Sequence, residues 1–362
     1  MMDSRDNRPK PPNALLGVAI AGLLTAYGIA SHRRERRHIA LASRGATDDA
    51  RGRTAKWPSQ IPWRGWWDIL LRANQAMSRR NLSLIAAGAA FYAFIAIPSA
   101  LAALVSLYGM VFDPTEVGKQ LQSLAGLLPD EALKLLSDQL RSLTSQSSKT
   151  LSASFVIGLA IALWSARSGA SSMITALNVA YDEQERRGYI RFQVAALGLT
   201  LGGVLFAIVA LCLIAVLPAV VGFLPFGDAG KTIAAIVRWP LLVIMLMAAL
   251  AATYRVGPCR AEPRWRWVSW GAVAATVAWL AGSALFSIYV SHFASYDKSY
   301  GSLGAVVVLL MWLYLSAFVI LLGAQLNAEV EHQTARDSTT GRPEPLGKRG
   351  AAMADSVGAA QS

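Results

Sequence analysis

The sequence has little charge, and long parts of it have none. Aspartate, glutamate, lysine and arginine make up 15% of its 362 residues. None of the four occurs in five stretches: 82–112, 150–166, 192–227, 267–296 and 299–328. Each stretch approaches or exceeds the roughly 20 residues that cross an apolar layer about 30 Å thick. Because 54% of the residues are hydrophobic, the composition excludes an ordinary soluble globular protein and predicts a membrane protein.

Two shorter apolar segments complete the set of predicted spans. One is 232–254, which carries the single charged residue Arg238, and the other is 13–30 near the N-terminus. Since a helix satisfies its own backbone hydrogen bonds in lipid, each span is expected to be helical. We therefore predict an all-α fold: a polytopic membrane helix bundle of six core transmembrane helices plus an N-terminal transmembrane anchor.

Cysteine and histidine are scarce, which limits the available chemistry. Cys212 lies in an apolar span and Cys259 in a loop, so no disulfide is expected. Metal-dependent hydrolysis needs several His, Asp or Glu side chains that converge on an ion. The four histidines are instead scattered over separate segments: His32, His38, His292 and His332. No P-loop and no G-x-S-x-G motif occurs. We predict no catalytic, metal-binding or cofactor-binding residue, no cofactor and no enzyme activity.

The basic residues are placed asymmetrically. If the helices alternate in direction, 24 Lys and Arg fall on one side, in 31–81, 167–191, 255–266 and 329–362, and 10 fall on the other. Basic loops stay in the cytoplasm, so the pattern predicts a multi-pass membrane protein with a cytoplasmic C-terminus. The net charge of +12 then requires no nucleic acid as a partner. A cleaved signal peptide is disfavoured, because it would place the basic segment 31–81 outside.

A tryptophan-rich segment precedes the first core span. It contains Trp57, Trp63, Trp66 and Trp67. At helical spacing, Trp66, Leu70 and Ala73 share one face, whereas Asp68 and Arg72 point elsewhere. This pattern fits an interfacial helix with its tryptophans at head-group depth, or equally a helix that docks its tryptophans on neighbouring helices.

Several polar or conformationally special residues lie in or near the spans. The candidate substrate-binding or bundle-interior positions are Pro98, Arg167, Asn178, Trp312, Ser316 and Asn327. Pro98 predicts a kink, which could mark a substrate path or a packing bend. Arg167 lies near a membrane boundary, where its guanidinium either reaches water or binds a lipid phosphate.

The remaining candidates have polar atoms that need partners. Asn178 lies in a less apolar continuation of the second span, which suits a cavity-lining face. In the last span Trp312, Ser316 and Asn327 share one helical face. Gly198 and Gly202 in the third span form a small-residue pair of the kind that allows close helix contact.

The chain divides into three parts. Residues 1–56 are an N-terminal anchor and a basic cytoplasmic linker, 57–332 are the membrane domain, and 333–362 are a tail that we predict to be disordered. Within the membrane domain, the outer loop 113–149 has leucines at helical spacing. It predicts two short amphipathic helices that act as a passive cap or a lid.

Three stretches together resemble the YihY/BrkB family of bacterial inner-membrane proteins. They are LWSARSGASSMITALNVAYDEQERRGYIRF, YRVGPCRAEPRWRWVSWGAVAATVAWLAGSALFSIYV and the start of the last span, YDKSYGSLGAVVVLLMWLY. The similarity covers about residues 60–332, although the ARSG after Trp164 departs from the more usual serine-rich run. The resemblance implies a six-helix membrane domain. The family has carried a ribonuclease label and a serum-resistance association, and a role in moving lipids has been suggested.

Two functions of different classes follow. The first is movement of a lipid or another amphipathic substrate without tight ion coupling, since no acidic residue lies inside a span. The alternative is a non-transporting envelope scaffold or a virulence-associated membrane protein. The expected partners are membrane lipids, with a homo-oligomer or envelope proteins as further candidates. Transport predicts a cavity lined by the second and sixth core spans, and a scaffold predicts a solid bundle.

Overall fold

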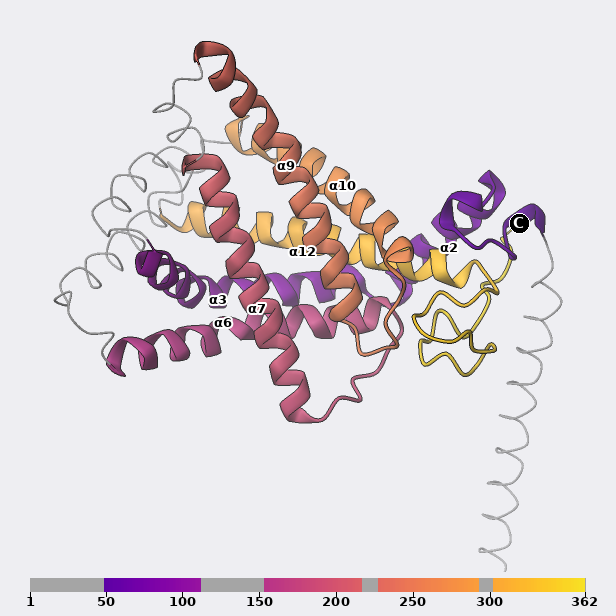
Figure 1. Cartoon of the computed structure of the whole chain (residues 1–362). Helices are drawn as coiled ribbons and strands as arrows, with labels where there is room; N and C mark the ends of the chain where they lie inside the picture. The colour runs from indigo at the N-terminus through magenta and orange to yellow at the C-terminus, as the bar shows by residue number, and fades with distance from the viewer. Residues whose placement is uncertain (1–48, 112–152, 217–226, 293–301, 362) are drawn as a thin grey trace, which may run out of the picture.

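The computed structural model describes residues 49–111, 153–216, 227–292 and 302–361 (Figure 1). Within these ranges every long element is a helix: α2 (Trp63–Arg79), α3 (Leu82–Val111), α6 (Ala153–Ala180), α7 (Tyr189–Leu211), α9 (Gly227–Val256), α10 (Trp265–His292) and α12 (Ser302–His332). The 3-10 turns Asp49–Arg51 and Pro58–Gln60 precede α2, and a π-helical turn, Cys212–Val216, follows α7. The expected anchor at 13–30 and the outer loop at 113–149 lie outside the described residues.

The six helices from α3 to α12 correspond to the six predicted core spans, so the all-α membrane bundle is confirmed. Five of them contain segments long and apolar enough to cross a membrane: Leu82–Ala100, Tyr189–Ile214, Ile236–Val256, Trp265–Ser291 and Val306–His332. The sixth, α6, has a less apolar second half because it contains Arg167 and several serines.

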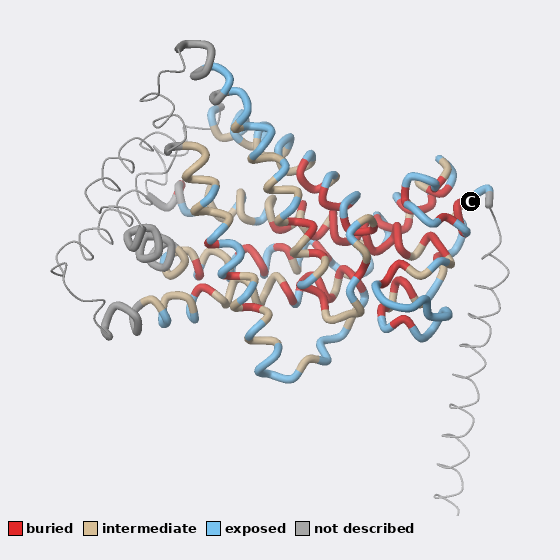
Figure 2. The backbone as a smooth tube through the Cα atoms, in the orientation of Figure 1, coloured by how far each residue is buried: buried red, intermediate tan, exposed pale blue. Residues whose placement is uncertain are grey.

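Each helix of the bundle packs against specific neighbouring helices. Helix α3 packs along α6 and α12, α12 packs along α10, and α10 packs along α9. In Figure 1 α3, α6 and α12 run side by side, and α7 and α9 cross them. Figure 2 shows that buried backbone gathers toward the end of the bundle that carries α2 and residues 333–361. We call this end the tail end.

Close approach of α10 and α12 depends on two glycines. A Cβ atom on Gly271 would collide with the carbonyl oxygen of Gly323 and with the side chain of Asn327. A Cβ atom on Gly323 would lie 2.5 Å from the hydroxyl oxygen of Tyr254 on α9. Because lipid supplies no hydrophobic drive between helices, such close backbone contact is a main source of association. The predicted pair Gly198 and Gly202 has no such role among the described residues, since nothing lies within 4 Å of a Cβ on either.

Helix α2 is attached to the bundle through the side that carries Asp68 and Arg72. Asp68 and Arg72 are 1% and 4% exposed, whereas Trp63 and Trp67 are 73% and 51% exposed. The sequence pattern placed these charged side chains away from the Trp66 face but did not predict what they contact. They find partners on α12 and on the residues flanking α2 and α12. Asn81, with a φ of 51°, turns the chain between α2 and α3.

The C-terminal segment differs from its prediction. Residues 333–361 were expected to be disordered, but the structure folds them against the tail end (Figure 1). Met353 is 4% exposed and belongs to the main hydrophobic core, and Arg349 is 7% exposed. A polar composition predicted disorder here because the buried partners of these side chains lie far away in the sequence.

Candidate functional site

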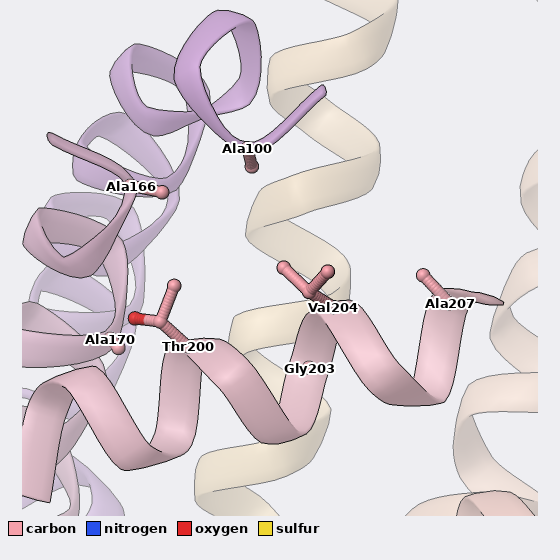
Figure 3. Close-up of a pocket in the computed structure, with 7 residues that line it drawn as sticks. All are labelled: Ala100, Ala166, Ala170, Thr200, Gly203, Val204 and Ala207. Carbon is pink, nitrogen blue, oxygen red and sulfur yellow. The ribbon is translucent and has the colours of Figure 1, made fainter. Parts of the chain in front are cut away.

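A recess of about 270 Å³ lies between the first three core helices. Small and apolar residues of α3, α6 and α7 line it: Ala100, Ala166, Ala170, Thr200, Gly203, Val204 and Ala207. Figure 3 shows Thr200 and Val204 projecting from α7 toward the alanines of α6 and α3. The recess lies just below the roughly 300–1,000 Å³ of typical small-molecule pockets, so it suits part of a lipid rather than a whole one. Transport predicted a cavity lined by the second and sixth core spans, whereas this recess is lined by the first, second and third.

Polar side chains stand beside this apolar recess. Ser99 on α3 and Ser165 on α6 are joined by a hydrogen bond of 2.8 Å between their hydroxyl oxygens. Arg167 follows Ala166, which lines the recess, and donates to the side-chain oxygen of Gln193 on α7. Its guanidinium carbon lies 4.1 Å from the ring centroid of Trp164. Thr200 adds no free donor, because its hydroxyl donates to the backbone of its own helix at Ala196.

Arg167 is the charged group nearest this recess. Among the described residues it has no carboxylate partner, and its Nε atom is buried without a hydrogen bond. Pro98 precedes the lining residue Ala100 by two positions, and α3 continues through it as one helix with the proline side chain exposed. Of the six candidate residues, these two lie close to the recess.

Trp312 and Ser316 contact α10 rather than the recess. The indole Nε1 of Trp279 donates to the hydroxyl oxygen of Ser316 at 3.0 Å. The ring of Trp312 lies edge-on to that of Trp279, with centroids 5.9 Å apart. These contacts join α12 to α10 inside the bundle.

Asn178 and Asn327 connect elements at the tail end. The side-chain oxygen of Asn327 accepts from the backbone amide of Gly271 at 2.7 Å, and its nitrogen donates to the carbonyl of Val268 at 3.0 Å. Asn178 accepts from the backbone amide of Cys259 at 2.7 Å and donates to Glu185 at 2.9 Å. Both asparagines therefore bridge helices or loops, and neither lines the recess.

The sequence reasoning missed a buried polar network around the end of α12. Its members on α12 and just after it are Gln325, Asn327, Glu329, Glu331 and Gln333, all at most 4% exposed. Residues two apart point in different directions on a helix, so this end of α12 is surrounded by other elements. The sequence signal was alternation of polar residues after position 324 in a helix, which is unusual beside a membrane span.

Two buried ion pairs form the centre of this network. Arg72 on α2 donates its Nε to Glu329 at 2.7 Å, and its Nη2 donates to Gln333 at 2.6 Å. Arg260, in the loop between α9 and α10, lies 2.5 Å from Glu331 with both side chains fully buried. Burial lowers the pKa of Arg260, but the Glu331 carboxylate, together with Tyr181 and Glu183, raises the pKa above its ordinary value.

A more exposed pair flanks the network. Arg187 donates to both carboxylate oxygens of Glu185 at 2.7 Å. These hydrogen bonds, together with the one from Asn178, lower the pKa of Glu185 to about 2. Glu185 therefore stays ionised at neutral pH and holds the loop between α6 and α7 against Asn178.

The charged groups do not gather into a metal-ligand set within the described ranges. In that part of the chain no three His, Cys, Asp or Glu side chains converge in a way that could hold a metal ion. Most acidic groups described above are instead paired with arginines, which is typical of a network that joins elements.

Most of this chain matches a known protein family. Residues 73–346, from within α2 to the start of the C-terminal segment, match the family described as Virulence factor BrkB. The chain belongs to this BrkB family. The matched region contains all six core helices and the buried Arg260–Glu331 pair, whereas Arg72 lies just before it, so the architecture described above is that of a BrkB-family membrane protein.

Several bacterial proteins are similar to part of this chain. A ribonuclease-like protein, YfkH, of Bacillus subtilis is 38% identical over 176 residues, which are 47% of this chain and 63% of that protein. A UPF0761 membrane protein, IL2447, of Idiomarina loihiensis is 27% identical over 238 residues, 65% of this chain and 78% of that protein. A UPF0761 membrane protein of Vibrio cholerae is 31% identical over 98 residues, 26% of this chain and 32% of that protein. The match thus spans less than two thirds of YfkH. No solved structure matches this chain.

Proposed function

We propose that this BrkB-family protein moves a lipid or another amphipathic molecule across the bacterial inner membrane, along the recess between α3, α6 and α7 and without tight ion coupling. The observation that carries the proposal is the combination of an apolar recess with an arginine beside it that has no carboxylate partner among the described residues. Alanine and glycine walls accept an acyl chain, and a guanidinium suits a head-group phosphate.

The proposal also states that the tail end faces the cytoplasm and that the protein has no enzyme activity. The 24 Lys and Arg on the side of the tail end, against 10 on the other, support a cytoplasmic tail. The absence of ion coupling is supported by acidic residues that, in the described spans, occur only near their ends and pair with arginines, as Glu329 does with Arg72. The ribonuclease-like name of YfkH describes that protein, and for this chain we propose no catalytic activity.

A non-transporting scaffold is the competing function. The packed contact of α10 with α12, closed by Gly271 and Gly323, favours it, because this half of the bundle is solid. A scaffold would bind envelope proteins or a second copy of the chain and would not need the recess.

Reconstitution into liposomes separates the two functions. Fluorescent phospholipid in the inner leaflet should become accessible to a membrane-impermeant quencher faster in vesicles with the protein than in protein-free vesicles. Gly203→Trp should abolish most of this acceleration, because Gly203 lines the recess and nothing lies within 4 Å of its Cβ position to resist the indole.

A matched control lies on the same helix. Gly198→Trp places the same side chain at an exposed position of α7 that does not line the recess and also has open space. It should leave the rate unchanged. Equal rates in protein-containing and protein-free vesicles would remove the lipid proposal for the lipids tested, and equal inhibition by both variants would remove the recess as the route.

A further inference from the structure

Helix α2 presents an apolar face outward, although Asp68 and Arg72 of the same helix face the protein. Trp63, Trp67 and Leu70 are 73%, 51% and 46% exposed, and they follow one another at helical spacing. Tryptophan is favoured at the boundary between lipid and water, where the ring is buried and its N–H group stays hydrated. An outward face of this kind indicates that α2 lies on a membrane surface rather than in bulk water.

Contacts of α2 with α10 place this face at the level where α10 enters the apolar layer. The ring of Trp66 lies 5.3 Å from that of Trp270, five residues after the start of α10. One turn further on, α10 exposes Val273 and then Val277, as a lipid-facing helix does. The N-terminal half of α2 therefore lies beside the boundary of the membrane-spanning region.

A second recess, of about 450 Å³, opens on this part of α2. It is lined by Arg51, Trp63, Arg64, Trp67, Asp68 and Gln361. The negative charge of Asp68 is balanced by Arg51, whose Nη1 atom lies 2.7 and 2.8 Å from its two carboxylate oxygens. The backbone amide of Gln361 also donates a hydrogen bond to Asp68 at 3.0 Å.

Arg64 gives this recess a positive charge that no described residue balances. Its side chain is exposed, and within the described part of the chain no carboxylate or other hydrogen-bond partner contacts it. The recess thus combines one unmatched cation with two exposed indole rings. An anion satisfies the cation, and only an anion carried by a lipid also explains the outward indoles.

We propose that this recess binds the head group of an anionic phospholipid from the leaflet that faces the tail end. Arg64 binds the phosphate, and Trp63 and Trp67 flank the glycerol and the first acyl carbons. This site is separate from the recess between α3, α6 and α7. It does not depend on the proposed transport, because a bound lipid here would hold α2 to the membrane whether or not lipid moves through the bundle.

Native mass spectrometry of the full-length protein tests the site. The protein and its Arg64→Ala variant are mixed in one detergent sample and titrated with phosphatidylglycerol, so that each reports its lipid adducts under identical conditions. Loss of one interfacial charge contact is expected to lower the apparent affinity about five-fold. Arg79→Ala is the matched control, since Arg79 is an exposed arginine at the other end of the same helix and does not line the recess.

Separate outcomes would overturn the role of Arg64, the selectivity for an anionic head group, and the choice of a lipid over a free anion or a protein. Equal loss of phosphatidylglycerol in Arg64→Ala and Arg79→Ala would overturn the site in favour of general surface charge. Equally tight binding of phosphatidylcholine would overturn its selectivity for an anionic head group. Displacement of the lipid by an equimolar amount of inorganic phosphate would identify a simple anion site. If Trp63→Ala changed the oligomeric state but not lipid binding, the surface would bind a protein instead.

Discussion

At the scale of single residues, the tail end is held by charges that are paired out of contact with water. Arg260 and Glu331 are both fully buried, and Arg72 and Glu329 are each 5% exposed. Such pairs add little net stability compared with apolar packing, but removal of one partner leaves a buried charge without compensation. Their importance for this protein is therefore that each arginine must meet its own glutamate for the elements to assemble.

Glu331→Gln tests this dependence on charge. The substitution preserves shape but leaves Arg260 unpaired, and it should lower the free energy of unfolding by about 3–5 kcal/mol. Glu262→Gln is the control, because Glu262 pairs with Arg255 while 60% of its side chain is exposed, and exposed pairs contribute about 0–1 kcal/mol. Denaturation followed by tryptophan fluorescence in detergent measures both. Equal losses in the two variants would show that Arg260 does not depend on the Glu331 charge.

At the scale of elements, the C-terminal segment 333–361 contacts several separate elements at the tail end and holds them together. It reaches α2 where Arg72 donates to the carbonyl of Ala359 at 3.0 Å, and it reaches the α6–α7 loop where Ala352 donates its backbone amide to Glu183 at 2.7 Å. Burial raises the pKa of Glu183, whereas the hydrogen bond from Ala352 lowers it. The family match ends at residue 346, so the part of the segment that makes these contacts extends beyond the matched region.

Arg349 organises this segment from within. Its guanidinium donates to four backbone carbonyls, those of Ala335, Arg336, Glu344 and Ala354, at 2.6–3.2 Å. Arg349→Ala should raise the rate of cleavage in the segment by proteinase K about 30-fold, because loss of these bonds costs at least about 2 kcal/mol of local stability.

The exposed residue Arg342 provides the comparison. Arg342→Ala should leave the cleavage rate within two-fold of the unmodified protein, since an exposed surface substitution changes stability by about 0.5 kcal/mol or less. Rapid cleavage of the unmodified protein at the same sites would mean that the segment is not held against the bundle in solution.

At the scale of the whole molecule, the sequence predicted the spans well because absence of charge is a property of each segment alone. The first span was expected at 82–112, and α3 is Leu82–Val111. The burial of a charged side chain in an ion pair depends on partners far away in the sequence, which the composition of a segment does not reveal. No buried partner was therefore predicted for Glu329 and Glu331, which follow the charge-free stretch 299–328, although α12 continues through them to His332. The position of the recess was missed for the same reason, since it depends on which helices are neighbours.

The orientation of the molecule remains a prediction that one labelling experiment can test. Ser356→Cys introduces an exposed thiol on the C-terminal segment, in a background where Cys259 is replaced by serine. If the helices alternate in direction, 24 of the Lys and Arg fall on the side of this segment and 10 fall opposite, so the thiol should face the cytoplasm. A membrane-impermeant maleimide should then label it in inverted membrane vesicles but not in intact spheroplasts. Cys212, which lies in the span Tyr189–Ile214, should stay unlabelled in both, because a thiol in apolar surroundings is unreactive. Labelling in intact spheroplasts but not in inverted vesicles would reverse the orientation, and the lipid site on α2 would then belong to the outer leaflet of the same membrane.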